Sequence, residues 1–212
     1  MGPSLQTLRQ KLHDDRGFTL IEMAIVLIII GIIIGAVVKG KDIVRSAEQK
    51  KLYSEFILEW QIAFNNYNDR TGWILTDSND PNNAGIRNGR CGDNVTDVNA
   101  DLQLQAVGLT PPSKGSTGSS MARTYTDSNG VQHTLLIRFD WKAAQGNFIR
   151  ITDMPNDLGI AIDRIVDGSA DGTTGDVLST DDHGPGTINL QPWPSATLAP
   201  DANDALILKL QF

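Results

Sequence analysis

Cysteine is almost absent from this chain, which holds a single one, Cys91, among 212 residues. One thiol cannot form an internal disulfide, so other contacts must hold the fold together. Cys91 lies in the polar stretch 87–92. This setting favours a plain thiol, with an intersubunit bridge or a ligand role as the alternatives.

Basic residues are also few. The chain has 18 Lys and Arg against 25 Asp and Glu, which gives a net charge of −7. Nucleic-acid phosphates demand clustered Lys and Arg, so we expect no general nucleic-acid binding, although a small local basic patch stays compatible with this balance.

Enzyme signatures are missing as well. His133 and His183 stand alone, without a Cys or Glu at metal-ligand spacing, and His13 precedes the long apolar run. The glycine-rich stretches 115–118 and 172–175 lack the lysine and the strand-to-helix context of phosphate loops. We therefore expect no zinc site, no His-centred triad and no enzymatic activity.

Charge is missing from a long stretch near the N-terminus. No Asp, Glu, Lys or Arg lies between Glu22 and Lys39. Residues 18–38 would span about 30 Å as a helix, which is the thickness of a bilayer core. An ionised acid such as Glu22 costs roughly 2.5–3.5 kcal/mol in hydrocarbon, so it usually has a partner and a function. The alternative is an anchor that tolerates one charge near its end.

Residues 1–17 form a polar leader ahead of this run, with three basic and two acidic side chains. A conventional secretory signal places its cleavage site after the apolar core, whereas Gly17 precedes it here. Cleavage at Gly17 would remove only the leader and leave the apolar helix on the mature protein. The mature chain would then carry 15 Lys and Arg against 23 Asp and Glu.

The stretch 16–27, Arg-Gly-Phe-Thr-Leu-Ile-Glu-Met-Ala-Ile-Val-Leu, resembles the class III signal sequence of type IV pilins and type II secretion pseudopilins. The resemblance implies that a prepilin peptidase cleaves between Gly17 and Phe18 and that Phe18 is then N-methylated. It also implies an assembly contact, in which Glu22 neutralises the α-amine of Phe18 on a neighbouring subunit.

The same resemblance implies partners and a location. The expected partners are other pilin or pseudopilin subunits, the prepilin peptidase, an inner-membrane assembly platform and membrane lipid. The expected location is the bacterial inner membrane, as a single-pass protein with a periplasmic head, and afterwards a pilus or a periplasmic filament. Charge alone does not fix this orientation, because basic residues occur on both sides of the apolar run.

The helix pattern continues beyond the apolar run. Apolar residues from Ile43 to Tyr67 recur mostly every three or four positions, which predicts an amphipathic continuation over 39–72. Gly72 is an exit signal. Many proteins of the resembled family have a proline after the apolar run, and this proline permits local melting of the helix. This chain has only Gly40 at that place, so the sequence leaves open whether the helix melts there.

Residues 73–212 are expected to form a globular head. Period-two patterns predict three strands, at 133–141, 147–151 and 205–212. Helix patterns occur at 97–109 and 153–168, the latter with Asp153 as its N-cap and Gly168 at its end. The stretch 113–120 is rich in Ser and Gly and predicts a flexible linker or a loop tip.

These elements predict an α+β fold, in which a long N-terminal helical spine packs on a small antiparallel sheet, similar to a type IV pilin. The expected division of the chain is a cleaved leader, a membrane or filament-core helix, an amphipathic continuation of the spine and a head, at 1–17, 18–38, 39–72 and 73–212.

Acidic residues gather in one C-terminal loop, at Asp167, Asp171, Asp176, Asp181 and Asp182. Calcium takes six to eight hard oxygen ligands, which such a loop could supply, although the spacing does not fit an EF-hand. The family resemblance adds that some pseudopilins bind calcium in a C-terminal loop instead of forming a disulfide. Calcium is therefore the only cofactor candidate, and a solvated acidic turn is the favoured alternative.

The function that these patterns indicate is a structural subunit, major or minor, of a type IV pilus-type filament. The alternative is a pseudopilin of a type II secretion system, which shares the leader and the spine. An anchored enzyme or ligand-binding domain would need a convergent polar pocket, for which the sequence offers only the acidic loop. Adhesion, motility, DNA uptake and secretion are not distinguished by the sequence.

Overall fold

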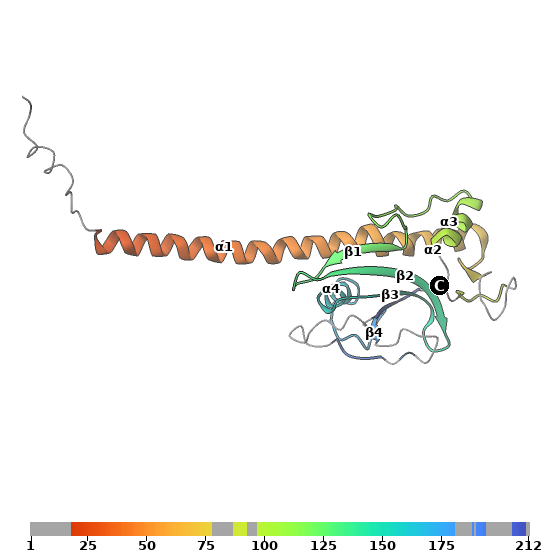
Figure 1. The fold of residues 1–212 in the computed structure, drawn as a ribbon. Coiled ribbons are helices and arrows are strands. Elements are labelled where there is room, and N and C mark those ends of the chain that lie inside the picture. Colours follow the sequence, from red (N-terminus) through yellow and green to blue (C-terminus); the bar gives the residue numbers. More distant parts are fainter. Residues whose placement is uncertain are drawn as a thin grey trace, which may run out of the picture. The chain divides into compact units, whose positions relative to one another are not determined.

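The long apolar and amphipathic stretch forms one continuous helix in the computed structural model (Figure 1). It consists of α1 (Leu20–Leu52), a π-helical turn η1 (Tyr53–Ile57) and α2 (Leu58–Thr71). The helix continues through Gly40. It ends at Gly72, which has a φ of 70° and donates its N–H to the Asn68 carbonyl at 2.7 Å. Glycine adopts this left-handed conformation at no steric cost, so the predicted helix end is confirmed.

The structure describes residues 18–77, 87–92, 97–180, 188, 190–193 and 205–210. The chain divides into two compact units, Met1–Arg45 and Ser46–Phe212. The described residues of the first unit, 18–45, contain most of α1 with its apolar run. The second unit is the head, and it includes the end of α1.

The head is an α+β arrangement, which confirms the predicted fold class. Its antiparallel sheet has the strand order β1-β2-β3-β5-β4. The strands are β1 (Ala122–Thr126), β2 (Gln132–Lys142), β3 (Gly146–Thr152), β4 (Val177–Thr180) and β5 (Ala205–Lys209). Two further helices, α3 (Asp97–Ala106) and α4 (Asn156–Val166), complete the head (Figure 1).

The amphipathic stripe of the helix packs on one face of the sheet. Its buried side chains include Phe56, Trp60 and Phe64, each about 0–1% exposed. The Phe139 ring of β2 stacks on Phe64, with centroids 5.3 Å apart, and meets the Trp60 ring edge-on at 5.7 Å. Burying such aromatic side chains contributes most of the hydrophobic stabilisation of a small core. The three- and four-residue spacing in the sequence therefore identified the core face of the helix correctly.

The C-terminal strand lies inside the sheet. β5 pairs with β3 on one side and with β4 on the other. The backbone N–H of Leu210 also donates to the Asn147 carbonyl at 3.0 Å. Strand pairing on both sides therefore holds the C-terminal region in a chain that has no cysteine pair. Residues 211–212 of the predicted strand lie outside the described residues.

Two sequence-based expectations for the head were wrong. The sheet has two more strands than expected, β1 and β4. The N-cap of α4 is Pro155 rather than Asp153. The stretch 113–120 is a mostly exposed loop, in line with the expected loop tip, and only Ser120 at its end is buried, where its carbonyl accepts the Trp60 indole N–H at 2.8 Å.

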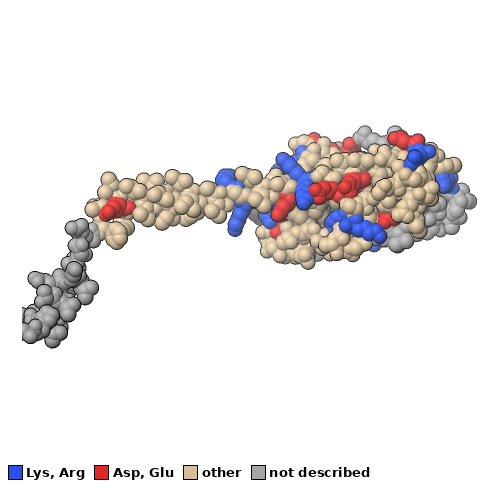
Figure 2. Space-filling view, turned by 90° about the horizontal axis from the view of Figure 1, so that it is seen from above, with Lys and Arg blue, Asp and Glu red and all other residues tan. Residues whose placement is uncertain are grey.

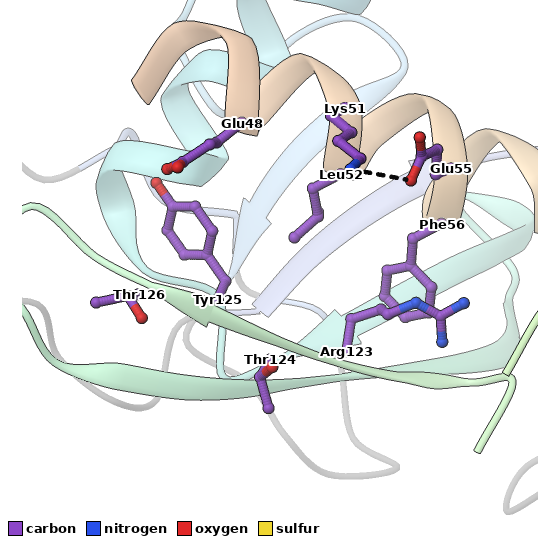
Figure 3. Close-up of a pocket in the computed structure, with 9 residues that line it drawn as sticks. All are labelled: Glu48, Lys51, Leu52, Glu55, Phe56, Arg123, Thr124, Tyr125 and Thr126. Carbon is purple, nitrogen blue, oxygen red and sulfur yellow. Dashed lines mark ion pairs between the residues drawn. The ribbon is translucent and has the colours of Figure 1, made fainter. Parts of the chain in front are cut away.

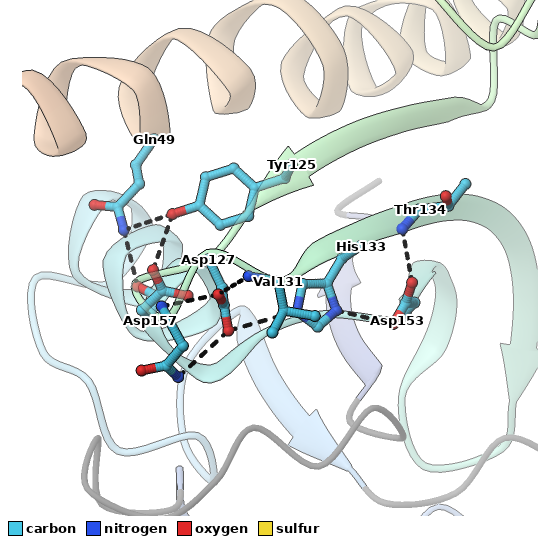
Figure 4. A network of polar contacts seen from close by, with 9 residues as sticks. Gln49, Tyr125, Asp127, Val131, His133, Thr134, Asp153 and Asp157 are labelled. Atoms are coloured by element: carbon cyan, nitrogen blue, oxygen red, sulfur yellow. Dashed lines mark hydrogen bonds and ion pairs between the residues drawn. The ribbon is translucent and has the colours of Figure 1, made fainter.

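Asp153 has a different role from capping. It adopts a left-handed φ of 58°. Its carboxylate accepts the Thr134 backbone N–H at 2.7 Å and lies 3.0 Å from Nδ1 of His133 (Figure 4). The loop between β3 and α4 is thereby fixed to strand β2. The predicted end of α4 is confirmed, because Gly168 follows the C-cap residue Asp167 with a φ of 78°.

Candidate assembly and processing segment

The first unit exposes a long apolar helix surface. Residues 18–38 are all exposed, and the helix Leu20–Thr71 contains a window of mean hydropathy 3.0 with none of its residues buried. By length and composition this helix can cross a membrane. Figure 2 shows an uncharged surface between the acid near its start and the first basic side chains. Such a surface needs lipid or similar helices to cover it.

Glu22 and Thr19 form a reciprocal hydrogen-bonded pair at the start of the helix. The Glu22 carboxylate Oε2 accepts the backbone N–H and the hydroxyl of Thr19, both at 2.8 Å. The Thr19 hydroxyl oxygen accepts the Glu22 backbone N–H at 3.3 Å. This is a capping box, in which two side chains satisfy backbone donors of the first helical turn.

The capping box changes the interpretation of Glu22. Backbone N–H groups at a helix start have no partner within the helix, and leaving them unpaired in hydrocarbon costs several kcal/mol each. The carboxylate meets part of this need and also lies at the positive end of the helix dipole. The second carboxylate oxygen, Oε1, has no hydrogen bond to any described residue. Glu22 therefore has a local partner and can still accept another donor.

The sequence already contained the signature of this pair. Thr19 and Glu22 are three positions apart and precede an apolar run, which is the spacing of a capping box. The assembly role expected for Glu22 does not involve Thr19. The structure shows that Thr19, which follows the expected new N-terminus Phe18, fixes the position of the Glu22 carboxylate by hydrogen bonds.

The expected cleavage site is only partly visible. Phe18 is 79% exposed and lies just before the helix. Gly17 lies outside the described residues, as does the rest of the leader. Cleavage after Gly17, methylation of Phe18 and pairing of Glu22 with a neighbour's α-amine therefore stay predictions.

Two of the candidate calcium ligands in the acidic loop, Asp167 and Asp171, accept hydrogen bonds from other residues of that loop. The Asp171 carboxylate accepts hydrogen bonds from the backbone and hydroxyl groups of Thr173 and Thr174. These bonds lower the pKa of Asp171 to about 2, with the Thr174 hydroxyl as the largest cause. The Asp167 carboxylate accepts the backbone N–H groups of Asp176 and Val177, at 2.9–3.1 Å.

These bonds bear on the calcium hypothesis. In the part of the chain that the structure describes, no three His, Cys, Asp or Glu side chains are placed to hold a metal ion. Asp181 and Asp182 lie outside that part. The structure thus gives an intraloop role for Asp167 and Asp171, and calcium binding stays an untested prediction.

The single cysteine is buried rather than exposed on a polar loop. Cys91 is 4% exposed, and burial raises the pKa of its thiol. Its backbone N–H donates to the Asn147 side chain at 2.9 Å. An intersubunit disulfide through Cys91 does not fit this burial, so the plain-thiol interpretation is the one that the structure supports.

Comparison with known proteins gives one match. Residues 12–38 match the family model of the prokaryotic N-terminal methylation motif. Comparisons with curated proteins and with solved structures give no match. The match covers the leader junction, the capping box and the exposed apolar helix. The chain therefore carries the N-terminal methylation motif, which is the prepilin motif of type IV pilins and pseudopilins.

Proposed function

We propose that this protein is a structural subunit of a type IV pilus-type filament. In this proposal the subunit waits in the inner membrane with its head on the periplasmic side, and it joins the filament after cleavage between Gly17 and Phe18. Its role is structural rather than enzymatic. The observation that supports the proposal most is an exposed helix that begins with a capped acid, Glu22, and carries no further charge before Lys39.

The apolar helix serves two states in this mechanism. Lipid covers it before assembly, and the helices of other subunits cover it in the filament core. Apolar groups cover this surface in both states, so transfer from the membrane to the filament need not expose it to water. Added Cβ atoms at Gly31 and Gly35 would meet nothing within 4 Å, so this side of the helix is open to close approach by another helix.

Glu22 supplies the register between subunits. Cleavage creates a positive α-amine on Phe18, and the free Oε1 of a neighbour's Glu22 can accept a hydrogen bond from it. Two opposite charges in a low dielectric attract strongly only when both are present, so a wrong register leaves two uncompensated charges. The capping box holds the carboxylate at the helix start, where a neighbour's N-terminus can reach it.

The test separates the charge of Glu22 from its capping role. Glutamine also serves in a capping box, so Glu22→Gln keeps the cap and removes the charge, whereas Glu22→Ala removes both. We expect both variants to be processed and membrane-bound but to lower filament yield at least tenfold, measured by immunoblot of sheared filaments. Thr19→Val removes the hydroxyl and keeps the charge, and we expect a smaller loss, about twofold to threefold.

Normal filament yield from Glu22→Gln would refute the charge mechanism and leave only the capping role of Glu22.

Gly17→Glu tests processing separately. We expect it to leave a larger precursor on a gel, and unchanged mobility would count against the leader assignment. A pseudopilin shares the same motif, so these variants do not separate a pilus from a type II secretion system. Filaments recovered outside the cell would indicate a pilus, and filaments confined to the periplasm would indicate a secretion system.

A further inference from the structure

A short loop at one end of the head is held in place by several side chains. The Asp77 carboxylate accepts the backbone N–H groups of Asn88 and Gly89, at 2.8 and 3.0 Å. The Asn88 side chain in turn accepts the Arg90 backbone N–H at 3.0 Å. Asn147 donates to the Gly89 carbonyl at 3.1 Å. Contacts from two distant segments thus fix the backbone of residues 88–90.

This loop presents two arginines, each stacked on an indole ring. The Arg87 guanidinium lies 4.4 Å from the Trp73 ring centroid, and that of Arg90 lies 3.7 Å from the Trp141 ring centroid. Both arginines are exposed, and neither has an ion pair with a described residue. Stacking fixes each planar guanidinium and leaves its N–H edge available for an anion. We call Trp73, Arg87, Arg90 and Trp141 the arginine surface.

A groove with carboxylates lies where the helix faces strand β1 (Figure 3). Its volume is about 390 Å³. The helix contributes Leu52 and Phe56 as apolar lining, with Glu48 and Glu55 as acidic groups. Glu48 is exposed and has no ion pair with a described residue. Glu55 has an ion pair with Lys51 at 4.0 Å, in which both side chains are more than 60% exposed, and a longer-range attraction to Arg123. We call this the acidic groove.

The basic residues of the groove offset its carboxylates only in part. Arg123 is attracted to Glu55 and to the nearby Glu59, but its N–H groups donate to carbonyl oxygens rather than to either carboxylate. The Arg123 guanidinium lies 4.9 Å from the Phe56 ring centroid and donates to the carbonyls of Ser119 and Ala122, at 3.1 and 2.9 Å. It also donates to the Ser113 carbonyl. Exposed pairs such as the contact between Lys51 and Glu55 contribute little, so an arriving arginine can replace that contact.

The two surfaces match in spacing as well as in charge. Arg87 and Arg90 are three residues apart, so their backbone positions are at most about 10 Å apart. Glu48 and Glu55 are seven residues apart on the helix, which is two turns or about 10 Å. Two fixed guanidinium groups can therefore meet two carboxylates together, while the arginine stems and the indoles cover the apolar lining.

We propose that the arginine surface of one copy of this chain docks in the acidic groove of the next copy. This inference rests on the proposed filament function, which brings many heads together. Within the head, Glu48 and Thr71 lie about 35 Å apart along the helix, so the two surfaces belong to different ends of the head. When two copies dock in this way, one arginine surface and one acidic groove stay open at the two ends of the pair. Further copies can therefore add, and the contact propagates along a filament instead of closing a dimer.

Cysteine crosslinking tests this contact in the full-length protein in assembling cells. In the double variant Arg90→Cys with Glu48→Cys, we expect oxidation to give a ladder of covalent multimers on a non-reducing gel. Cys91 is buried and does not interfere. The matched control, Arg90→Cys with Lys50→Cys, places the second thiol on another face of the helix and should give no ladder. Absence of the ladder in the first variant would overturn the inference.

Charge exchange gives a second, independent test. We expect Arg87→Glu with Arg90→Glu to lower filament yield at least fivefold, and Glu48→Arg with Glu55→Arg to do the same. Combining all four changes should restore at least half of the yield. Failure of the combination to rescue, or normal yield from either pair, would overturn the inference.

The two proposals fail in different ways. If filaments form in every charge variant, the filament function stands and the head contact is wrong. If Glu22→Gln assembles normally while the crosslinked ladder persists, the charge mechanism fails and the head contact stands. If the arginine variants lose retention on an anionic polymer such as heparin and the combined variant is not rescued, the surface binds a polyanion and the contact between copies is overturned.

Discussion

The indole N–H of Trp193 donates to Oδ2 of Asp163 at 2.7 Å, across 30 residues of sequence. The same carboxylate oxygen accepts the Gly172 backbone N–H at 3.0 Å. Both Trp193 and Asp163 are buried. This acid therefore joins helix α4 to two later segments of the head, and its surroundings predict how the protein responds to mutation and to pH.

The first prediction concerns Gly159, which lies under the Trp193 ring. A Cβ on Gly159 would fall 2.4 Å from two carbons of the indole, which is a rigid ring and buried. We expect Gly159→Ala to destabilise the head, because overpacking costs about 1–3 kcal/mol and the gain in helix propensity is at most about 1 kcal/mol. Urea unfolding of the protein in detergent micelles, followed by tryptophan fluorescence, measures this change.

Gly40→Ala is the matched control for that substitution. Gly40 is also helical, and an added Cβ there meets nothing within 4 Å. Only the propensity gain applies, so the control should leave the unfolding of the head unchanged. Equal unfolding midpoints for Gly159→Ala and the wild type would contradict the packing of Trp193 on α4.

The second prediction concerns the pH dependence of stability. Burial raises the pKa of Asp163, and the neighbouring Asp167 adds to this effect, while the bonds from Trp193 and Gly172 oppose it. A group with a higher pKa in the folded state binds its proton more tightly there. Its contribution to stability is complete below about pH 3.9, the unfolded value, and is lost as pH rises through the folded pKa.

Asp163→Asn should therefore gain stability relative to the wild type as pH rises from 4 to 7. The asparagine oxygen can still accept the bonds from Trp193 and Gly172, so the variant should fold. Unfolding midpoints in urea at several pH values measure the difference, and parallel pH profiles of the two proteins would refute the assignment.

Asp171→Asn should show the opposite trend. Hydrogen bonds lower the pKa of Asp171 to about 2, so its contribution is present above about pH 3.9 and is lost as pH falls towards 2. The variant should be less stable than the wild type at neutral pH, and the difference should vanish near pH 2. The effect should be small, because solvent screens this carboxylate.

The third prediction concerns the reactivity of Cys91. Thiol reagents attack the thiolate, and burial disfavours this charged form while also blocking access. We expect a chromogenic disulfide reagent to label the native protein at least a hundredfold more slowly than the urea-unfolded protein. Fast stoichiometric labelling of the native protein would show that the 87–92 loop opens readily.

Much of the fold followed from periodicity. The long helix and strand β2 carry strong apolar patterns because each buries one face, and the apolar runs of β3 and β5 reflect burial on both faces. Strands β1 and β4 were missed, since Ala-Arg-Thr-Tyr-Thr and Val-Leu-Ser-Thr are short and partly polar. Their neighbours in the sheet, rather than their own pattern, make them strands.

The site was predicted in part for similar reasons. Glu22 is conspicuous in the sequence because it is a charge within an apolar run, whereas the only signal at Thr19 is its three-residue spacing from Glu22. The burial of Cys91 could not be predicted from its polar neighbours. Those neighbours are fixed by Asp77 and Asn147, which are distant in sequence, and no local pattern reports such contacts.

The last prediction concerns the contacts that fix the helix to the head. The Gln49 side chain donates to the Tyr125 hydroxyl and to the Asp157 carbonyl, both at 3.2 Å (Figure 4). The Tyr125 hydroxyl donates to the Asp157 carboxylate at 3.0 Å. These bonds link α1, β1 and α4, and Gln49 is buried. Tyr125→Phe should therefore cost about 1–2 kcal/mol of unfolding free energy, because it removes the hydrogen bonds of the Tyr125 hydroxyl with the buried Gln49 and the half-buried Asp157.

A double-mutant cycle with Gln49→Ala tests whether this is one network. Residues in one hydrogen-bond network are not additive, so we expect a coupling energy of about 0.5–1.5 kcal/mol between the two changes. Tyr53→Phe is the matched control, because the Tyr53 hydroxyl has no hydrogen bond to a described residue, and it should cost little. Additive effects of Gln49→Ala and Tyr125→Phe would mean that each side chain acts alone, and the helix would then be held to the head by its apolar stripe.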